Sequence, residues 1–155
     1  MSARPGLAQP RHNAGLIAQA VGAVALATLA VIHVIDLPGT LGPLPLIGAG
    51  YLAIITTAIV VGGVMITRSH RLVWAATGLL AAAAMGGYIL TRTVDGFLGD
   101  HGDVGNWNCP LGLAALSVEA LLILLAAWQV SNHVTNLTFP PEAATRHAPE
   151  YSHSR

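Results

Sequence analysis

Ionisable side chains are rare in this sequence, and those near its apolar stretches fall into a few short segments. His33 and Asp36 are three positions apart near the end of the first apolar stretch, and Tyr88 and Arg92 are four apart near the end of the third. Both spacings place the two side chains of a pair on one face of a helix. Glu119 lies alone within the fourth stretch. Such groups could bind a small ligand or an ion, or could hold helix ends together.

Glu119 is the most deeply placed of these residues. It follows Pro110 by about 14 Å at 1.5 Å per helical residue, which is close to the middle of a bilayer. An ionised carboxylate there costs about 2.5–3 kcal/mol or more, so Glu119 should be paired or carry a proton. We expect Arg92, His33 and Asp36 to line a cavity that reaches down to Glu119. The alternatives are an Arg–carboxylate brace between helix ends and no contact at all.

Four long apolar stretches must position these side chains. They cover residues 14–36, 46–67, 72–94 and 110–130. Each is long enough to cross a hydrocarbon core of roughly 30 Å as a helix. Backbone groups in lipid must bond within the chain, which favours helix even where Ile and Val are frequent. The segment Leu37–Pro45, LPGTLGPLP, predicts a loop, because Pro and Gly interrupt helices.

The composition indicates the class of protein. The chain has 155 residues, of which 54% are hydrophobic and only 9% are charged, whereas soluble domains contain about 25% charged residues. We therefore predict an all-α polytopic membrane protein, a bundle of four transmembrane helices over residues 14–131. Residues 1–13 and 132–155 are polar and are expected to form a disordered lead and tail. The formal net charge of zero argues against a nucleic-acid partner. The expected partners are the lipid bilayer and either further copies of the chain or a larger membrane complex.

The arginines predict the orientation. They gather in three segments, which contain Arg4 and Arg11, Arg68 and Arg71, and Arg146 and Arg155. Four spans put all three segments on one face of the membrane, which the positive-inside rule makes cytoplasmic. Both termini are then cytoplasmic, in a bacterial inner membrane, and the polar residues above lie in the extracytoplasmic half. Trp74 and Trp128 fall at the cytoplasmic interface and Trp107 at the opposite one, as expected for an aromatic belt.

Metal, haem and catalysis have less support. The segment after the third stretch contains four candidate metal ligands: Asp95, Asp100, His101 and Asp103. Divalent ions accept such ligands, but DGFLGDHGD does not match a calcium loop, and Gly and Asp are common in turns. Haem across a bundle needs two intramembrane His ligands and only His33 qualifies, so we predict no cofactor. Cys109 and Ser117 have no base at a fixed spacing, which favours a non-catalytic protein over an enzyme.

A resemblance rests on YILTRTV at 88–94, GNW at 105–107 and PLGLAALSVEALL at 110–122. This pattern resembles a family of small four-span membrane proteins common in actinobacteria. The matching positions are Tyr88, Arg92, Thr93, Trp107, Pro110, Leu111, Gly112 and Glu119. HVIDLPG at 33–39 is similar to the end of the family's first helix. The sequence departs from the pattern at Thr91, Cys109 and Ala120, where the family has Ser, Glu and Gly. The resemblance implies the four-helix fold and implies no activity.

Three functional hypotheses follow. The first is a non-catalytic membrane protein, either an accessory subunit or a small-ligand-binding module with an extracytoplasmic polar pocket. The residues predicted for that pocket are His33, Asp36, Tyr88, Arg92, Trp107 and Glu119. The second is a small transporter or channel that acts as an oligomer, since four helices of this size hardly enclose a pore alone. The third is a membrane redox or metal-binding protein.

Overall fold

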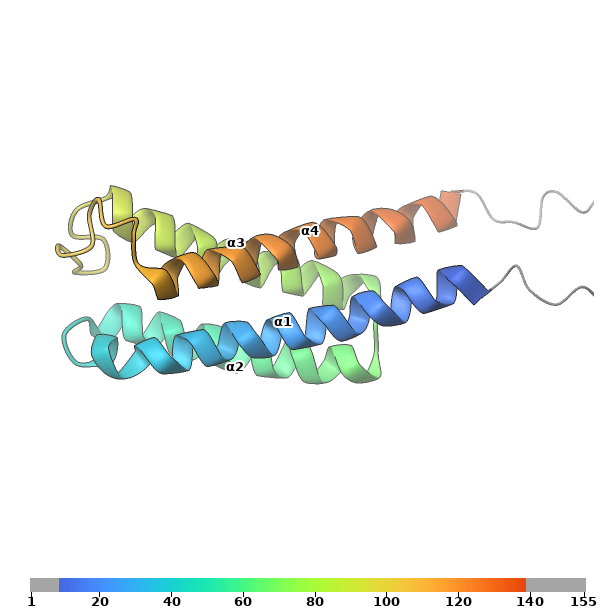
Figure 1. The fold of residues 1–155 in the computed structure, drawn as a ribbon, viewed down its shortest axis with the longest axis horizontal. Coiled ribbons are helices and arrows are strands. Elements are labelled where there is room, and N and C mark those ends of the chain that lie inside the picture. The colour runs from blue at the N-terminus through green and yellow to red at the C-terminus, as the bar shows by residue number, and fades with distance from the viewer. Residues whose placement is uncertain (1–8, 139–155) are drawn as a thin grey trace, which may run out of the picture.

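The structure is a computed structural model that describes residues 9–138, with side chains placed for residues 13–132. Its four helices are α1 (Gln9–Leu41), α2 (Pro45–Thr67), α3 (Arg71–Thr93) and α4 (Pro110–Thr138). They form an antiparallel bundle (Figure 1), in which α1 packs on α2, α3 packs on α4, and α1–α4 and α2–α3 contacts join the two pairs. The predicted all-α four-helix bundle is confirmed.

The bundle has two distinct ends (Figure 1). The α1–α2 and α3–α4 connections lie at one end, which we call the loop end. The α2–α3 turn lies at the other, together with the start of α1 and the end of α4, and we call this the terminal end. Each helix crosses the full distance between the two ends, so depth along a helix can be compared from one helix to the next.

The outward faces of the helices are apolar. Ile66, Leu72 and Leu124 are 68%, 73% and 69% exposed, which a protein surrounded by water rarely shows over so much of its surface. All four helices are long and apolar enough to cross a membrane. The spans cover Asn13–Leu41, Pro45–Thr67, Arg71–Thr93 and Pro110–Asn132. The fold is therefore that of a multi-pass membrane protein.

Some predicted boundaries differ from the structure. The loop predicted at Leu37–Pro45 is wrong for residues 37–41, because α1 continues through Pro38 to Leu41. Pro38 removes one backbone hydrogen bond only in the last turn, and membrane helices tolerate such a loss. Residues 9–13 and 132–138 are helical rather than disordered. The remainder of the predicted lead and tail, 1–8 and 139–155, lies outside the described residues.

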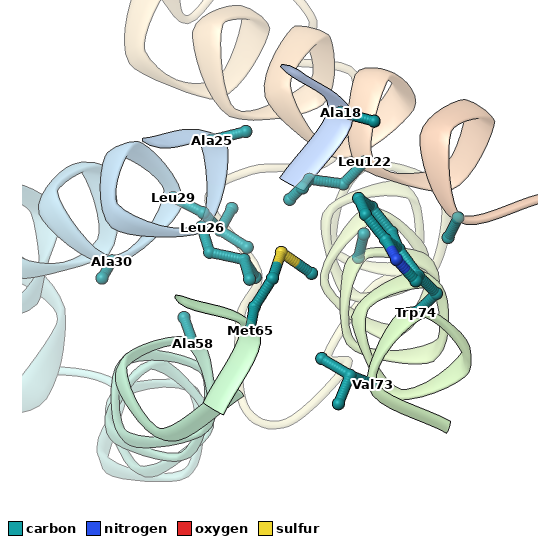
Figure 2. Close-up of a cluster of buried hydrophobic side chains, with 12 residues drawn as sticks. Ala18, Ala25, Leu26, Leu29, Ala30, Ala58, Met65, Val73, Trp74 and Leu122 are labelled. Atoms are coloured by element: carbon teal, nitrogen blue, oxygen red, sulfur yellow. The ribbon is translucent and has the colours of Figure 1, made fainter. Parts of the chain in front are cut away.

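Buried apolar side chains fill the half of the bundle nearer the terminal end (Figure 2). Met65 of α2 lies between Leu26 of α1 and Trp74 of α3. A Cβ on Gly22 would lie 2.9 Å from both Met65 Sδ and Trp74 Cη2, so only glycine leaves room for them. Trp74 is fully buried and donates its Nε1–H to Ser69 Oγ at 3.0 Å. Trp74 lies in the first turn of α3 at the terminal end, but it faces the packed interior and not the lipid.

We call this cluster the packed core. Its members are Ala18, Ala25, Leu26, Leu29, Ala30, Ala58, Met65, Val73, Trp74, Ala81, Leu122 and Ala126. A polar side chain also joins helices beside it: Gln19 Nε2 donates to the carbonyl oxygens of Met65 and Ile66. Both carbonyls belong to the last turn of α2, where helix geometry leaves them without backbone partners. Gln19 therefore ties α1 to the end of α2.

Candidate functional site

A cavity of about 690 Å³ occupies the loop end, between all four helices and the α3–α4 loop (residues 94–109). Its deepest wall residues include Ile54, Ala83 and Glu119, each about 14 Å from the loop-end terminus of its helix. The polar wall residues are His33, Asp36, Thr40, Tyr51, Tyr88, Thr91, Arg92, Asp100, Asp103, Asn106 and Glu119. Five of the six residues predicted for the polar pocket thus line one cavity, and Trp107 does not.

Three side chains hold one another on the α1–α2 wall. His33 is buried, and its Nδ1 lies 2.9 Å from the carbonyl oxygen of Leu29. A carbonyl only accepts, so Nδ1 carries the hydrogen. The His33 ring meets Tyr51 edge to face at 4.9 Å, and the Tyr51 hydroxyl donates to Asp36 Oδ2 at 2.9 Å. Sequence reasoning missed Tyr51, although it is a polar aromatic residue at the depth of Asp36 in an otherwise apolar span.

Arg92 joins the end of α3 to the loop that follows. Its side chain is only 8% exposed. Nη1 donates to Asp103 Oδ2 at 2.7 Å and to Thr91 Oγ1 at 2.9 Å, and Nε donates to the carbonyl oxygen of Asn106 at 2.7 Å. The guanidinium carbon lies 4.4 Å from the centroid of the Tyr88 ring, a cation–π distance. Three of the five N–H donors of Arg92 are therefore used within the chain.

The loop approaches the cavity through a tight turn at Phe97–Asp100. Asp100 N donates to the Phe97 carbonyl at 3.0 Å, and φ is positive at both Leu98 (51°) and Gly99 (90°). Positive φ suits glycine and strains leucine. The turn buries Asp100 to 3% exposure, and its Oδ1 accepts the backbone N–H of Gly102 at 2.9 Å. The second carboxylate oxygen of Asp100, a residue of the cavity wall, is buried without a partner.

Three wall residues of this cavity have an unpartnered polar atom. Among the described residues, three buried side-chain atoms have no hydrogen-bond partner: Tyr88 Oη, Asp100 Oδ2 and Glu119 Oε2. All three residues line the cavity. Glu119 is 1% exposed, and it forms no ion pair with Arg92, whose carboxylate partner is Asp103. Arg92 therefore pairs with a carboxylate of the loop that follows α3, and not with one on another helix as in the brace considered from the sequence.

Glycine and tryptophan position the ring of Tyr88. A Cβ on Gly112 would overlap this ring, so glycine at that position lets α4 approach Tyr88. Trp107 is 41% exposed and meets the Tyr88 ring at 6.2 Å between centroids, behind the cavity wall. Trp107 thus acts on the cavity through Tyr88, and Gly112 is a positioning residue that the predicted pocket did not include.

The four candidate metal ligands do not gather around one point. His101 Nδ1 bonds to Asp95 Oδ1 at 2.9 Å on the exposed surface, and neither residue lines the cavity. Asp103 bonds to Arg92, and Asp100 accepts backbone N–H groups. In the part of the chain that the structure describes, no three His, Cys, Asp or Glu residues lie close enough to hold a metal ion.

Comparisons of the chain with protein-family models, with curated proteins and with solved structures found no match. The resemblance to small four-span actinobacterial proteins stays a prediction. The function has to be argued from the geometry of the loop-end cavity.

Proposed function

We propose that this chain is a protein of the bacterial cytoplasmic membrane that binds a small molecule in its loop-end cavity without transforming it. It acts as a binding module on its own or as the accessory subunit of a larger membrane complex. One observation carries the proposal: Tyr88, Asp100 and Glu119, each with a buried polar atom that has no hydrogen-bond partner, all line a single cavity.

The energetic cost of these atoms argues for a ligand. A buried polar group without a partner costs about 1–3 kcal/mol, and a carboxylate at membrane depth costs about 2.5–3 kcal/mol or more. Glu119 is 1% exposed and accepts no hydrogen bond. If this position only had to support the helix, leucine would be more stable there than glutamate. Several such costs on one cavity are typical of a site that a bound molecule completes.

The cavity has the size and lining of a small-molecule site. Its volume of about 690 Å³ falls within the roughly 300–1,000 Å³ typical of such pockets. Apolar side chains such as Ile32, Ile47 and Phe97 form much of the wall, between the polar groups described above. An apolar wall with a few placed polar groups is the usual arrangement for recognition of a small molecule.

The arginine distribution supports an extracytoplasmic opening. Arg68 and Arg71 lie at the α2–α3 turn, on the terminal end. Arg92, at the loop end, is neutralised by Asp103. The positive-inside rule then puts the terminal end in the cytoplasm and the cavity on the other side.

Cys109 tests this orientation, because it is the only cysteine in the sequence and lies half-buried at the loop end. A membrane-impermeant maleimide should label Cys109 in intact cells. In the matched variant Cys109→Ser/Ser69→Cys, which moves the thiol to the α2–α3 turn, labelling should require cell lysis. The reverse pattern would place the cavity on the cytoplasmic side.

A cavity-filling substitution tests binding. Ala115 is buried in the wall one turn before Glu119, so Ala115→Phe should fill the site. Ala114 is exposed on the same helix, and Ala114→Phe is the matched control. Purified protein in nanodiscs is heated with a panel of small amines, alcohols and carboxylates, and unfolding is followed by tryptophan fluorescence.

At least one compound should raise the midpoint of unfolding of the wild type, since a ligand bound only by the folded state stabilises it. The shift should disappear in Ala115→Phe and persist in Ala114→Phe. Circular dichroism and elution volume establish that both variants fold. A wild type that responds to no compound, or a shift that survives in Ala115→Phe, would refute binding in this cavity.

A further inference from the structure

The cavity wall contains more acidic than basic side chains. Four carboxylates line it: Asp36, Asp100, Asp103 and Glu119. Among the wall residues, Arg92 is the single Arg or Lys. The wall carboxylates outnumber the single guanidinium even when Glu119, which has no partner, carries a proton. This excess disfavours an anionic ligand.

Most donors of the one guanidinium are used within the chain. Three of the five N–H donors of Arg92 bond to Asp103, Thr91 and the Asn106 carbonyl, and one face of the group lies over Tyr88. Asp103 and Arg92 neutralise each other at 2.7 Å. A carboxylate or phosphate that entered the cavity would compete with Asp103 for this guanidinium.

The remaining wall residues with unpartnered groups can all accept hydrogen bonds, and the Tyr88 hydroxyl can also donate one. Glu119 accepts no hydrogen bond, and Oδ2 of Asp100 has no donor. His33 donates through Nδ1 to a backbone carbonyl, so its neutral ring offers Nε2 as a further acceptor. A ligand that satisfies these acceptors must carry N–H or O–H donors. The excess of negative charge in the wall favours a cation. A protonated amine supplies both.

On this basis, and resting on the proposed binding function, we propose that the cavity binds a small organic cation whose ammonium group meets Glu119 and whose apolar part contacts the surrounding wall. Glu119 lies at the deep end, among Ile54, Ala84 and Ala115. The cavity is far larger than a dehydrated metal ion, and no three potential metal ligands converge among the described side chains. These two features favour an organic cation over an inorganic one.

Three compounds of one shape separate charge from size: 2-phenylethylammonium, 2-phenylethanol and phenylacetate. Dissociation constants are measured by calorimetry in nanodiscs at neutral pH for the wild type, Glu119→Gln and Asp95→Asn. The last is the matched control, because Asp95 is an exposed loop carboxylate outside the cavity wall. KCl at matching ionic strength tests an inorganic cation.

The wild type should bind the ammonium compound at least about tenfold more tightly than the alcohol, and phenylacetate least of all. Glu119→Gln should weaken ammonium binding by about tenfold or more and leave alcohol binding nearly unchanged. Asp95→Asn should behave like the wild type. The ratio of the two dissociation constants, for the ammonium compound and for the alcohol, is measured on the wild type. It therefore tests the proposal even if Glu119→Gln does not fold.

Equal binding of the alcohol, or tighter binding of phenylacetate, would overturn the cationic ligand and leave a ligand-binding cavity intact. Displacement of the ammonium compound by K⁺ at matching ionic strength would overturn the organic ligand in favour of an inorganic cation. Retention of ammonium binding in Glu119→Gln would also overturn the proposal. If no compound binds the wild type and none of the larger panel does, the proposed function falls as well.

Discussion

In the packed core, Met65 and Trp74 lie so close to Gly22 that a Cβ there would be 2.9 Å from each, whereas a Cβ on Gly50 or Gly87 in the cavity wall would meet nothing within 4 Å. Gly22 lets large side chains pack in the core, whereas Gly50 and Gly87 leave space in the cavity wall. The same four helices therefore close tightly near the terminal end and stay open near the loop end.

Polar groups show the same contrast. Near the packed core, Gln19 and Trp74 donate to groups on neighbouring segments. Around the cavity, Glu119 and Asp100 keep unpartnered oxygens although they are only 1% and 3% exposed. Association of helices in lipid depends on close packing rather than on the hydrophobic effect. We infer that the packed core stabilises the bundle, so that the cavity half can keep unfavourable groups for binding.

The largest expected effect tests this division directly. Leu26 is fully buried in the packed core, so Leu26→Ala should lower the free energy of unfolding by about 3 kcal/mol. Leu111 lines the cavity, and Leu111→Ala should cost about 1 kcal/mol or less, since it enlarges a space that already exists. Titration with SDS, followed by circular dichroism, measures both. Equal losses would show that the two halves are packed alike.

A smaller loss should follow the removal of the Arg92 side-chain contacts. Arg92→Gln leaves Asp103 and the Asn106 carbonyl without their donor, which should cost about 2 kcal/mol, because the Asp103 side chain is partly exposed. The freed loop should also raise the rate at which Cys109 reacts with a maleimide. The matched control is Arg71→Gln, at an exposed position on the terminal end of α3. If the two variants proved equally stable and equally reactive, Arg92 would not hold the loop.

Glu119→Leu should change stability in the opposite direction. The substitution removes a buried carboxylate that has no partner, so the free energy of unfolding should rise by about 1 kcal/mol, while ligand binding is lost. Glu119→Gln keeps the polar group and should remain close to the wild type in stability. The SDS titration and the calorimetry described above give both quantities. A less stable Glu119→Leu variant would mean that Glu119 supports the fold.

Much of the fold could be predicted because four apolar runs of sufficient length leave few alternatives in lipid. Counting residues along each helix also gave the depth of His33, Asp36 and Glu119, and so their common end of the bundle. The prediction failed at Pro38, where a rule for helix interiors was applied to a last turn. The inward orientation of Trp74 could not be predicted, because composition cannot reveal that Gly22 opens space opposite it.

The partner of Arg92 could not be predicted for a different reason. Both Glu119 and the loop carboxylates were within reach of its long side chain, and the choice depends on the path of the loop. Positive φ at Gly96, Gly99 and Gly105 sets that path and brings Asp103 to Arg92. The path of the loop depends on several glycines together. The spacing of residues in the sequence does not predict that path. Because Arg92 pairs with Asp103, it does not pair with Glu119.

The smallest expected effect concerns strain at the edge of the cavity. Leu98 lines the cavity with φ at 51°, a conformation that costs a non-glycine residue about 1 kcal/mol. Leu98→Gly should therefore raise the free energy of unfolding by about 0.5–1 kcal/mol, measured by SDS titration. Val104 in the same loop is similarly exposed and has no positive φ, so Val104→Gly should lower it by a similar amount. If both variants lost stability, Leu98 would store no strain, and the cavity half would differ from the packed core only in its unpartnered polar groups. If Leu98→Gly gains stability and weakens ligand binding, the strain is retained because it holds an apolar side chain against the cavity.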